Sequence, residues 1–210
     1  SSSSVYGGNR RLPFREAART DHPVSFYAAS KKANGAMGHS YTHLYGLPCT
    51  GLRFFTVYGP WGRPDMAYYK FALRIATGEV IEVYNEGRMR RDFTYIDDIV
   101  AGILGVLDKP AQPDPEFDIM HPHTGGSFAP YRLFNIGGAS PVGLMEFIAL
   151  LEKHLGRTAR VRLAPMQRGD VEETYADTSA LERLIGPIPR TGIDEGLARF
   201  AAWFKDYHGA

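Results

Sequence analysis

The 210-residue sequence lacks the features that mark secreted, membrane-spanning and nucleic-acid-binding proteins. Its one cysteine, Cys49, cannot pair within the chain, which excludes a disulfide scaffold and favours a reducing compartment. Lys and Arg number 24 against 23 Asp and Glu, so no overall field draws the chain to nucleic acid. Apolar runs such as 99–107 are too short to cross a bilayer, and residues 1–4 lack a signal-peptide layout. We therefore expect a cytoplasmic protein with neither nucleic-acid nor membrane partners.

What the sequence does contain is enough apolar surface for a packed core, with 44% apolar and 12% aromatic residues. Helix-like and strand-like segments alternate, which predicts an α/β fold with a mainly parallel sheet. The expected helices cover 25–45, 64–77, 97–107, 141–155, 178–184 and 193–207. One expected strand ends at 1–4, and four others cover 50–58, 80–84, 131–136 and 160–163. A turn is expected at 85–91. The proline-rich segment 109–130 predicts a surface loop or insertion.

Tyr27 and Lys31 are four residues apart on the first expected helix, so their side chains lie one turn apart on the same face. A free tyrosine has a pKa of about 10, and a neighbouring ammonium group favours its ionised form. The spacing alone is weak evidence, because a tyrosine followed by a solvated lysine is the more frequent arrangement. The pair gains weight from its context, between the expected strand end at 1–4 and a strand that finishes in the run 53–60.

These features together resemble the extended short-chain dehydrogenase/reductase family, which contains nucleotide-sugar epimerases and dehydratases. Further matches are RDFTYIDD at 91–98, FNIG at 134–137, and GD at 169–170 followed by YADTS at 175–179. Within the family the sequence is most similar to the UDP-glucuronate 4-epimerases, through SSSSVYG, TVYGPWGRPDM and MRRD. The resemblance implies an incomplete Rossmann-type parallel sheet with a smaller C-terminal α/β substrate-binding domain, NAD as cofactor, a UDP-sugar substrate, and a homodimer when intact.

The resemblance also implies domain boundaries. Residues 1–63 are the remainder of the NAD-binding domain with the catalytic helix, 64–96 are substrate-domain elements, 97–140 are a Rossmann helix and strand with the proline-rich loop, and 141–210 are mainly the substrate-binding domain. No dinucleotide-binding glycine fingerprint occurs in the sequence. In these enzymes the fingerprint lies on the first strand–helix turn, so we expect the chain to be the C-terminal two-thirds of an epimerase and to be inactive alone.

The resemblance assigns three residues to catalysis. Tyr27 is the base, Lys31 lowers the pKa of that tyrosine and holds the nicotinamide ribose, and Ser2 donates a hydrogen bond to the 4-oxygen of the sugar. Tyr27 and Lys31 therefore also contact the cofactor. Tyr58 is a further expected cofactor contact.

Small hydroxyl groups are expected at the sugar. Dehydratases of the family carry an Asp–Glu pair where Ser3 and Ser4 stand, and without those acids the elimination lacks its acid and base. Ser3, Ser4 and Thr56 can instead donate to a carboxylate at sugar C6 without adding negative charge, and Arg63 can add a positive charge. The alternative is that Thr56 merely ends a strand and that Arg63 is solvated.

The nucleotide is expected to contact four residues that the resemblance identifies. The resemblance implies that Arg91 clamps the diphosphate and that Tyr84 forms part of the uracil pocket. It also implies that Gln167 and Asp170 contact the ribose and the phosphate side of the nucleotide. The alternative is that Arg91 and its neighbouring arginines lie in an ordinary turn and are solvated. Arg168 departs from the family, which has Pro before Gly-Asp.

No metal site is expected. Asp118, His121 and His123 could suggest one, but no fourth ligand is evident and the implied reaction needs none. We therefore expect 4-epimerisation of UDP-glucuronate through transient oxidation at C4 with tightly bound NAD. Two alternatives stay open, an epimerase of a neutral UDP-hexose and a non-catalytic UDP-sugar-binding fragment.

Overall fold

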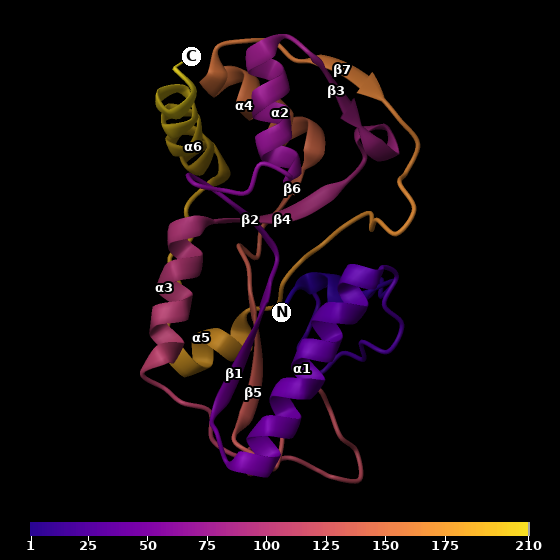
Figure 1. Ribbon diagram of the computed structural model, residues 1–210, viewed down its shortest axis with the longest axis vertical. Helices are drawn as coiled ribbons and strands as arrows, with labels where there is room; N and C mark the ends of the chain where they lie inside the picture. The colour runs from indigo at the N-terminus through magenta and orange to yellow at the C-terminus, as the bar shows by residue number, and fades with distance from the viewer. Residues whose placement is uncertain (210) are drawn as a thin grey trace.

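The computed structural model describes residues 1–209, and Figure 1 shows two groups of helices and strands stacked along the long axis of the molecule. The helices are α1 (Phe26–Tyr45), α2 (Ala67–Thr77), α3 (Ile96–Leu107), α4 (Leu144–Leu155), α5 (Ser179–Ile185) and α6 (Ile193–His208). The strands are β1 (Cys49–Phe54), β2 (Thr56–Tyr58), β3 (Val80–Val83), β4 (Arg90–Tyr95), β5 (Tyr131–Ile136), β6 (Pro141–Gly143) and β7 (Arg160–Leu163). Two 3₁₀ helices, η1 (Ser3–Tyr6) and η2 (Tyr84–Gly87), complete the fold. The alternation of helices with parallel strands confirms the predicted α/β class.

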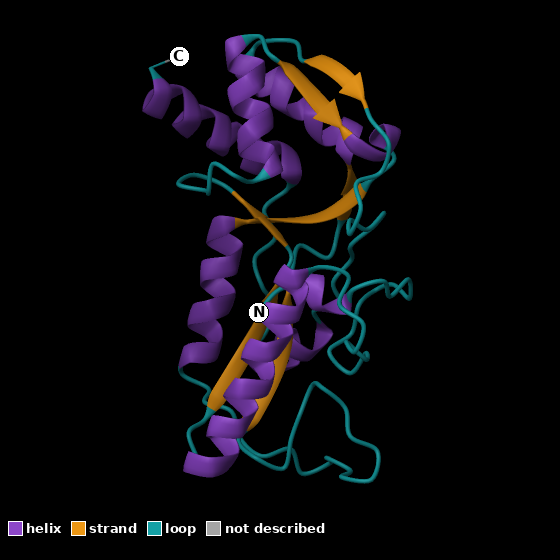
Figure 2. Cartoon of the chain, turned by 45° about the vertical axis from the view of Figure 1, so that its right-hand side comes forward, coloured by secondary structure: helices purple, strands orange, loops and turns teal. Residues whose placement is uncertain are grey.

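The first group is built on a parallel strand pair. β1 and β5 pair from Cys49 opposite Tyr131 to Phe54 opposite Ile136. Figures 1 and 2 show α1 on one side of this pair and α3 and α5 on the other. A hydrophobic core on the second side contains Ile136 and Leu181. Burial of such side chains supplies the main favourable free energy of this layered arrangement.

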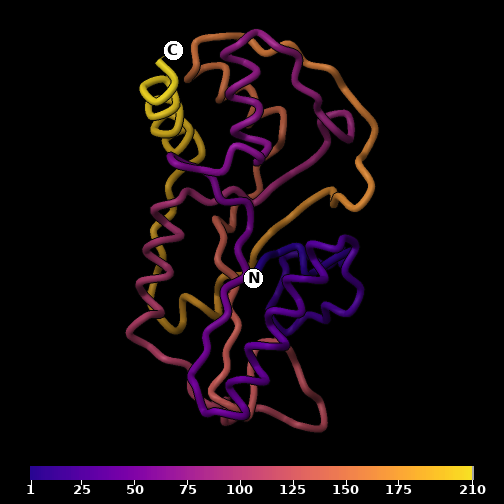
Figure 3. Tube along the Cα trace, viewed as in Figure 1, coloured from indigo at the N-terminus to yellow at the C-terminus, as the bar shows by residue number. Residues whose placement is uncertain are grey.

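The second group surrounds the largest hydrophobic core. β2 pairs in parallel with β4, β4 pairs antiparallel with β6, and β3 pairs in parallel with β7. Helices α2, α4 and α6 pack around them, and Phe147, Phe200 and Phe204 are almost fully buried there. Figure 3 shows that the chain crosses between the two groups several times, so neither group is one continuous segment. The expected division into domains stays a proposal.

Helix α1 begins and ends at residues that suit its termini. The Ser25 hydroxyl accepts a hydrogen bond from the Ala28 N–H at 3.1 Å and caps the first turn. Gly46 ends the helix in the left-handed region, with φ 65°, and its N–H donates to the Thr42 carbonyl. These caps place Tyr27 in the first turn, close to the junction between the two groups.

The predicted single strand at 50–58 is wrong, because this segment forms β1 and β2 in two different sheets. Phe55 separates the two strands, and its buried ring lies 6.5 Å from the Tyr6 ring and 6.4 Å from the Phe14 ring. β1 pairs with β5, whereas β2 pairs with β4. A continuous strand-like segment without a turn signal does not indicate such a change of partner strand.

The predicted helix start at 141 is also wrong. Residues Pro141–Gly143 form β6, in which Pro141 lies opposite Asp92 of β4, and α4 begins only at Leu144. β4 itself covers part of the segment predicted as a turn at 85–91, and no strand was expected there. Short strands of this kind depend on pairing across the sheet rather than on their own sequence.

Other boundaries shift by a few residues. α2 begins at Ala67 rather than 64, with Met66 as its N-cap residue. The expected strand end at 1–4 is a single bridge between Ser2 and Phe54, and η1 follows it. Tyr84 begins η2 instead of finishing β3. The remaining predicted helices and strands agree with the structure to within a residue or two at their ends.

The segment 109–130 contains neither helix nor strand, as predicted. Asp114 anchors it to Arg132 at 2.6 Å, and Asp118 contacts His121 at 2.7 Å. Within residues 1–209 no three His, Cys, Asp or Glu side chains come together as metal ligands would. None of the helices in the described part is long and apolar enough to cross a membrane.

Candidate functional site

The serine run lies beside the carboxyl end of β1. Ser2 forms the bridge to Phe54, and its hydroxyl accepts a hydrogen bond from the Ser4 N–H at 3.2 Å. The Ser4 Oγ is buried and has no hydrogen-bond partner among residues 1–209. A buried hydroxyl without a partner costs free energy, so Ser4 is a candidate to bond a ligand.

β2 and β4 bring Thr56 and Arg91 to one face. Thr56 lies opposite Phe93 in the parallel pair. Arg91 stands two residues before Phe93 on the same strand, and strand residues two apart share a face. The hydroxyl of Thr56 and the guanidinium of Arg91 therefore reach the same side of the sheet.

Two cavities border this face. We call them the serine cavity, about 170 Å³, which Ser3 and Ser4 line, and the aromatic cavity, about 250 Å³, whose walls include Phe93 and Phe147. The cavities adjoin, because three residues line both. The sequence-predicted residues that line one or both cavities are Ser3, Ser4, Thr56, Tyr84, Arg91 and Asp170.

Arg91 carries the charge between the two cavities. Its side chain is 15% exposed, and its Nη2 donates to Asp170 Oδ1 at 3.3 Å. Its Nη1 donates to the carbonyl oxygens of Glu172 at 3.1 Å and Arg90 at 3.0 Å. Burial lowers the pKa of Arg91 and the Asp170 carboxylate opposes that shift, but a guanidinium stays protonated at neutral pH. The arrangement holds a fixed cation beside space for a ligand.

The aromatic cavity has a mainly apolar lining. The Phe93 and Phe147 rings stack with centroids 4.2 Å apart. The Tyr84 hydroxyl donates to Glu82 Oε2 at 3.2 Å, and this carboxylate raises the pKa of Tyr84. Tyr84 and Glu82 thus place polar groups at a cavity whose other walls suit a flat ring.

Helix α1 borders the serine cavity with its N-terminal end, because Val24 and Ser25 line that cavity. Tyr27 is half exposed, and Lys31 Nζ lies 5.5 Å from the centroid of its ring. Within residues 1–209 neither the Tyr27 hydroxyl nor the Lys31 ammonium group donates a hydrogen bond. Both groups are therefore available to a ligand, which is the condition that a bound cofactor or sugar would require.

Six predicted residues do not line either cavity, and three of them are the residues assigned to catalysis, Ser2, Tyr27 and Lys31. The other three lie as follows. Tyr58 is 1% exposed in the core of the second group, where its hydroxyl has no partner and burial raises its pKa. Arg63 is solvent-exposed and pairs with Asp65 at 3.2 Å. Gln167 is exposed, and its backbone carbonyl oxygen accepts a hydrogen bond from the Asp170 backbone N–H at 3.2 Å. The structure thus keeps Tyr58 and Arg63 away from the cavities and leaves Gln167 one turn from Asp170.

Several lining residues were not predicted from the sequence. Thr174 and Ser25 line the serine cavity, and Glu82 lines the aromatic cavity. Ser25 could have been found, because a serine before a helical run is a cap and lies at the helix end. No sequence signal marks Thr174. Its hydroxyl accepts a hydrogen bond from the Asp92 N–H, and Asp92 lies 82 positions earlier in the sequence, so only the fold brings Thr174 to the site.

Comparison with known proteins gives close relatives over almost the whole chain. Protein CapI of Staphylococcus aureus is 52% identical over 208 residues, which cover 99% of this chain and 62% of that protein. A probable UDP-glucuronate 4-epimerase of Rhizobium meliloti is 48% identical over 210 residues, covering 97% of this chain and 60% of that protein. The chain therefore spans about three-fifths of the length of these relatives.

A solved structure shares the fold. The UDP-glucuronic acid 4-epimerase of Bacillus cereus, in complex with UDP-glucuronic acid and NAD, superposes with a TM-score of 0.82 at 28% identity. The match covers 99% of this chain and 60% of that one, so the α/β arrangement is that of a Rossmann-type epimerase. The family model that describes the NAD dependent epimerase/dehydratase family matches residues 1–120. Because this match covers more than half of its length, the chain belongs to the NAD dependent epimerase/dehydratase family.

Proposed function

We propose that this chain forms the UDP-sugar-binding and proton-transferring part of an NAD-dependent UDP-glucuronate 4-epimerase. One observation supports this most directly: Thr56, Arg91 and Asp170 line both adjoining cavities. A site with a fixed cation in the middle, a mainly apolar cavity on one side and small hydroxyl groups on the other matches the three parts of a UDP-sugar. Relatives and solved structures named for UDP-glucuronate support the same assignment.

The nucleotide end belongs in the aromatic cavity. Phe93 and Phe147 stack on each other and belong to the apolar lining, against which a planar uracil could lie, with Tyr84 in the same lining. Arg91 faces both cavities and would hold the diphosphate through its planar, charged fork. Asp170 and Gln167 would contact the ribose, since both lie at the turn that meets Arg91.

The sugar end belongs in the serine cavity. Ser4 Oγ is buried without a partner, so a bound oxygen acceptor would satisfy it. Ser3 and Thr56 line the same cavity and can donate to the C6 carboxylate without adding negative charge. Arg91 already pairs with Asp170, which limits the repulsion between that side chain and an acidic sugar. We leave Arg63 out of these contacts because its side chain pairs with Asp65 outside both cavities.

The acid–base chemistry falls to residues of α1 and η1. Tyr27 would take the proton of the sugar 4-hydroxyl, and the Lys31 ammonium group beside its ring would stabilise the resulting anion. Ser2, at the start of η1, would donate a hydrogen bond to the 4-oxygen. Lys31 would also hold the cofactor, whereas Tyr58 is left out because it is buried in the core. NAD, when bound, supplies reversible hydride transfer at sugar C4.

A neutral UDP-hexose is the second candidate substrate. The placement of Arg63 favours it, because the exposed side chain adds no positive charge to the serine cavity. Hydroxyl groups alone discriminate less strongly than a charged partner between a carboxylate and a hydroxymethyl group. The identity of the sugar therefore has to be tested by comparing the two.

The test uses a fusion in which the part of the Staphylococcus aureus CapI protein that precedes the matched region is placed before Ser1. Turnover of UDP-glucuronate and of UDP-glucose is measured in the parent and in Thr56→Val, which keeps the shape and removes the hydroxyl. A hydrogen bond to a charged group is worth about 1.5 to 3 kcal/mol, so kcat/KM for UDP-glucuronate should fall roughly 10 to 150-fold. UDP-glucose should lose less.

Thr50→Val is the matched control, since Thr50 lies on β1 and lines neither cavity. It should leave both substrates unaffected. An equal loss for both sugars in Thr56→Val would favour the neutral hexose. Binding of UDP-sugar without turnover of either substrate would leave only a non-catalytic binding role.

A further inference from the structure

A buried polar network lies next to the serine run, and none of the roles assigned above uses it. Tyr6 is the last residue of η1 and is 3% exposed. Its hydroxyl donates a hydrogen bond to Asn135 Oδ1 at 2.6 Å and accepts one from Arg53 Nη1 at 3.0 Å. Arg53 is 4% exposed and Asn135 is fully buried, so these three polar side chains bond to one another away from solvent.

The direction of each hydrogen bond in the network follows from the chemistry of its members. Asn135 Nδ2 donates to the carbonyl oxygens of Phe14 at 2.8 Å and of Asp177 at 3.2 Å, which leaves Oδ1 to accept from the Tyr6 hydroxyl. A guanidinium can only donate, so the Tyr6 hydroxyl accepts from Arg53 and gives its own proton to Asn135. Turning any of the three side chains would leave a buried polar group without its partner, which costs free energy.

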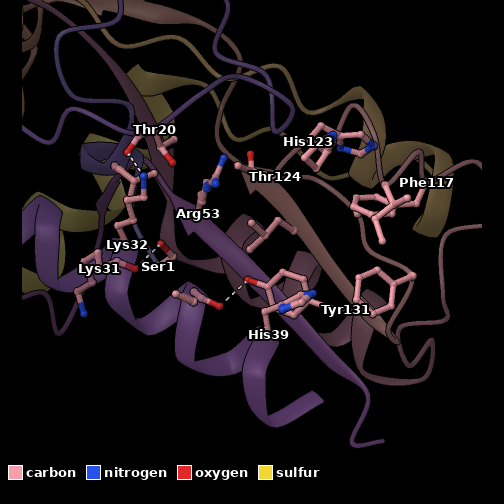
Figure 4. Close-up of a pocket in the computed structure, with 18 residues that line it drawn as sticks. Ser1, Thr20, Lys31, Lys32, His39, Arg53, Phe117, His123, Thr124 and Tyr131 are labelled. Atoms are coloured by element: carbon pink, nitrogen blue, oxygen red, sulfur yellow. Dashed lines mark hydrogen bonds between the residues drawn. The ribbon is translucent and has the colours of Figure 1, made fainter. Parts of the chain in front are cut away.

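Arg53 is held from a second side. Its Nη1 also donates to the Glu16 carbonyl oxygen at 3.3 Å, and its guanidinium carbon lies 5.0 Å from the centroid of the Tyr6 ring. Figure 4 shows the Arg53 side chain beside Thr124, whose hydroxyl donates to the same Glu16 carbonyl oxygen. Glu16 Oε1 in turn accepts the Asn135 backbone N–H at 2.8 Å. The network therefore ties β1, β5 and the segment after η1 together.

The same network holds two walls of the serine cavity. Ser3 and Ser4 line that cavity and belong to the same short helix as Tyr6. The Gly7 N–H closes the last turn of this helix on the Ser4 carbonyl oxygen at 3.1 Å. Phe14 also lines the serine cavity, and its ring stacks on the Tyr6 ring with centroids 4.6 Å apart. Both walls are thus fixed through Tyr6.

We propose that Tyr6, Arg53 and Asn135 are positioning residues that hold the sugar end of the site in its binding geometry. The inference rests on the proposed function, in which Ser3 and Ser4 contact the sugar. A four-residue 3₁₀ helix has little stability of its own, because the first helical turn is costly to form. The buried hydrogen bonds of Tyr6 supply that stability, and groups fixed in advance lower the entropic cost of binding.

Tyr6→Phe tests the proposal, because it deletes the hydroxyl and keeps the ring that stacks on Phe14. Calorimetric titration of the 210-residue chain compares UDP-glucuronate with UDP-xylose, which lacks the C6 carboxylate. In the parent we expect UDP-glucuronate to bind at least about 10-fold more tightly, the lower bound for a hydrogen bond to a charged group. In Tyr6→Phe this ratio should fall by at least about 5-fold, the equivalent of one neutral hydrogen bond, while the affinity for UDP itself is kept.

Tyr69→Phe is the matched control. Tyr69 is a buried tyrosine whose hydroxyl bonds to His208 Nε2 at 2.9 Å, and it lines neither the serine nor the aromatic cavity. It should leave the ratio unchanged. A parental ratio in Tyr6→Phe, or an equal fall in Tyr69→Phe, would overturn the positioning role alone. Equal affinity of the parent for the two UDP-sugars would remove the sugar end of the proposed function, and the positioning role with it.

Hydrogen exchange of the free chain gives a second readout that needs no ligand. The Val5 N–H donates to the Ser2 carbonyl oxygen at 3.2 Å, and the Gly7 N–H closes the last turn of η1. Both amides should be protected in the parent and should exchange at least about 5-fold faster in Tyr6→Phe, while the amides of α6 keep their rates. If Tyr6→Phe does not fold, the parent decides. Exchange of its Val5 and Gly7 amides at the rate of an unstructured peptide would overturn the proposal.

Discussion

Arg91 of β4 reaches across to Asp170, 79 positions later in the sequence, with 3.3 Å between Nη2 and Oδ1. The pair joins the strand that faces both cavities to the loop that follows β7. An arginine tied to backbone carbonyls and to one carboxylate has little freedom to turn away, so its fork is oriented before any ligand arrives. Such preorganisation lowers the entropic cost of binding a diphosphate.

Arg91→Leu should weaken binding of UDP to the 210-residue chain by roughly 10 to 150-fold, because the hydrogen bonds to the charged diphosphate are lost. Isothermal titration with UDP measures this. Arg88→Leu is the matched control, since Arg88 is an exposed arginine that lines neither the serine nor the aromatic cavity. Unchanged UDP affinity in Arg91→Leu, or an equal loss in Arg88→Leu, would remove Arg91 from the proposed site.

Tyr27→Phe should reduce kcat of the CapI fusion at least about 100-fold while UDP-sugar binding is kept. The substitution removes the ionisable oxygen, and the half-exposed ring has little packing to lose. Tyr41→Phe is the control, because Tyr41 lies on the same helix, is 61% exposed and lines neither cavity. The measurement is steady-state turnover of UDP-glucuronate. A kcat close to that of the parent would exclude Tyr27 as the base.

Much of the fold could be predicted because its elements carry local signals. Ser25 and Gly46 mark the ends of α1, and Gly137 and Gly138 directly follow β5 and stop it. The site residues Ser3, Ser4 and Thr56 were expected together because the resemblance covers their motifs, and the structure does bring them to one cavity. Their roles stay predictions.

The errors arise where distant segments decide the structure. β6 is a strand only because it pairs with β4, where Pro141 lies opposite Asp92. The local sequence by itself favours a helix that begins after a cap at Ser140. Tyr58 follows Thr56 by two residues, yet it is enclosed by the core of the second group, which forms from segments far along the chain. Packing of this kind cannot be read from the order of residues in one strand.

The outer face of α1 predicts self-association. Met37, Tyr41 and Leu44 are 56%, 61% and 68% exposed, and they lie at helical spacings that place them along one side. We expect the chain to form a homodimer through this face, and Tyr41→Glu to shift it towards the monomer in light scattering after gel filtration. His43→Glu, at an exposed position of α1 whose side chain lies against Phe128 and off this face, should not. Identical masses for parent and Tyr41→Glu would place any contact elsewhere.

Asp92 predicts a pH-dependent stability at the junction of the two groups. Its carboxylate is fully buried, and Oδ2 accepts the Ala176 N–H at 2.8 Å and the Ala139 N–H at 3.2 Å. Burial raises the pKa of Asp92 to about 6 from 3.8, although the backbone N–H groups, Ala176 foremost, oppose the shift. Asp92 therefore binds a proton more tightly in the folded state than in the unfolded state.

A folded-state pKa above the unfolded value means that Asp92 costs stability as the pH rises through about 4 to 6. A difference of about two pKa units corresponds to about 3 kcal/mol in the free energy of unfolding. Urea unfolding between about pH 4 and 7 should therefore show this loss in the parent and in Asp206→Asn, where an exposed carboxylate is removed. Asp92→Asn has no group to titrate at that position, so its profile should be flatter by that amount. If the curves of Asp92→Asn and the parent run parallel, burial of Asp92 does not set the pH dependence, and the junction between β4 and residues 139 and 176 is stabilised by other contacts.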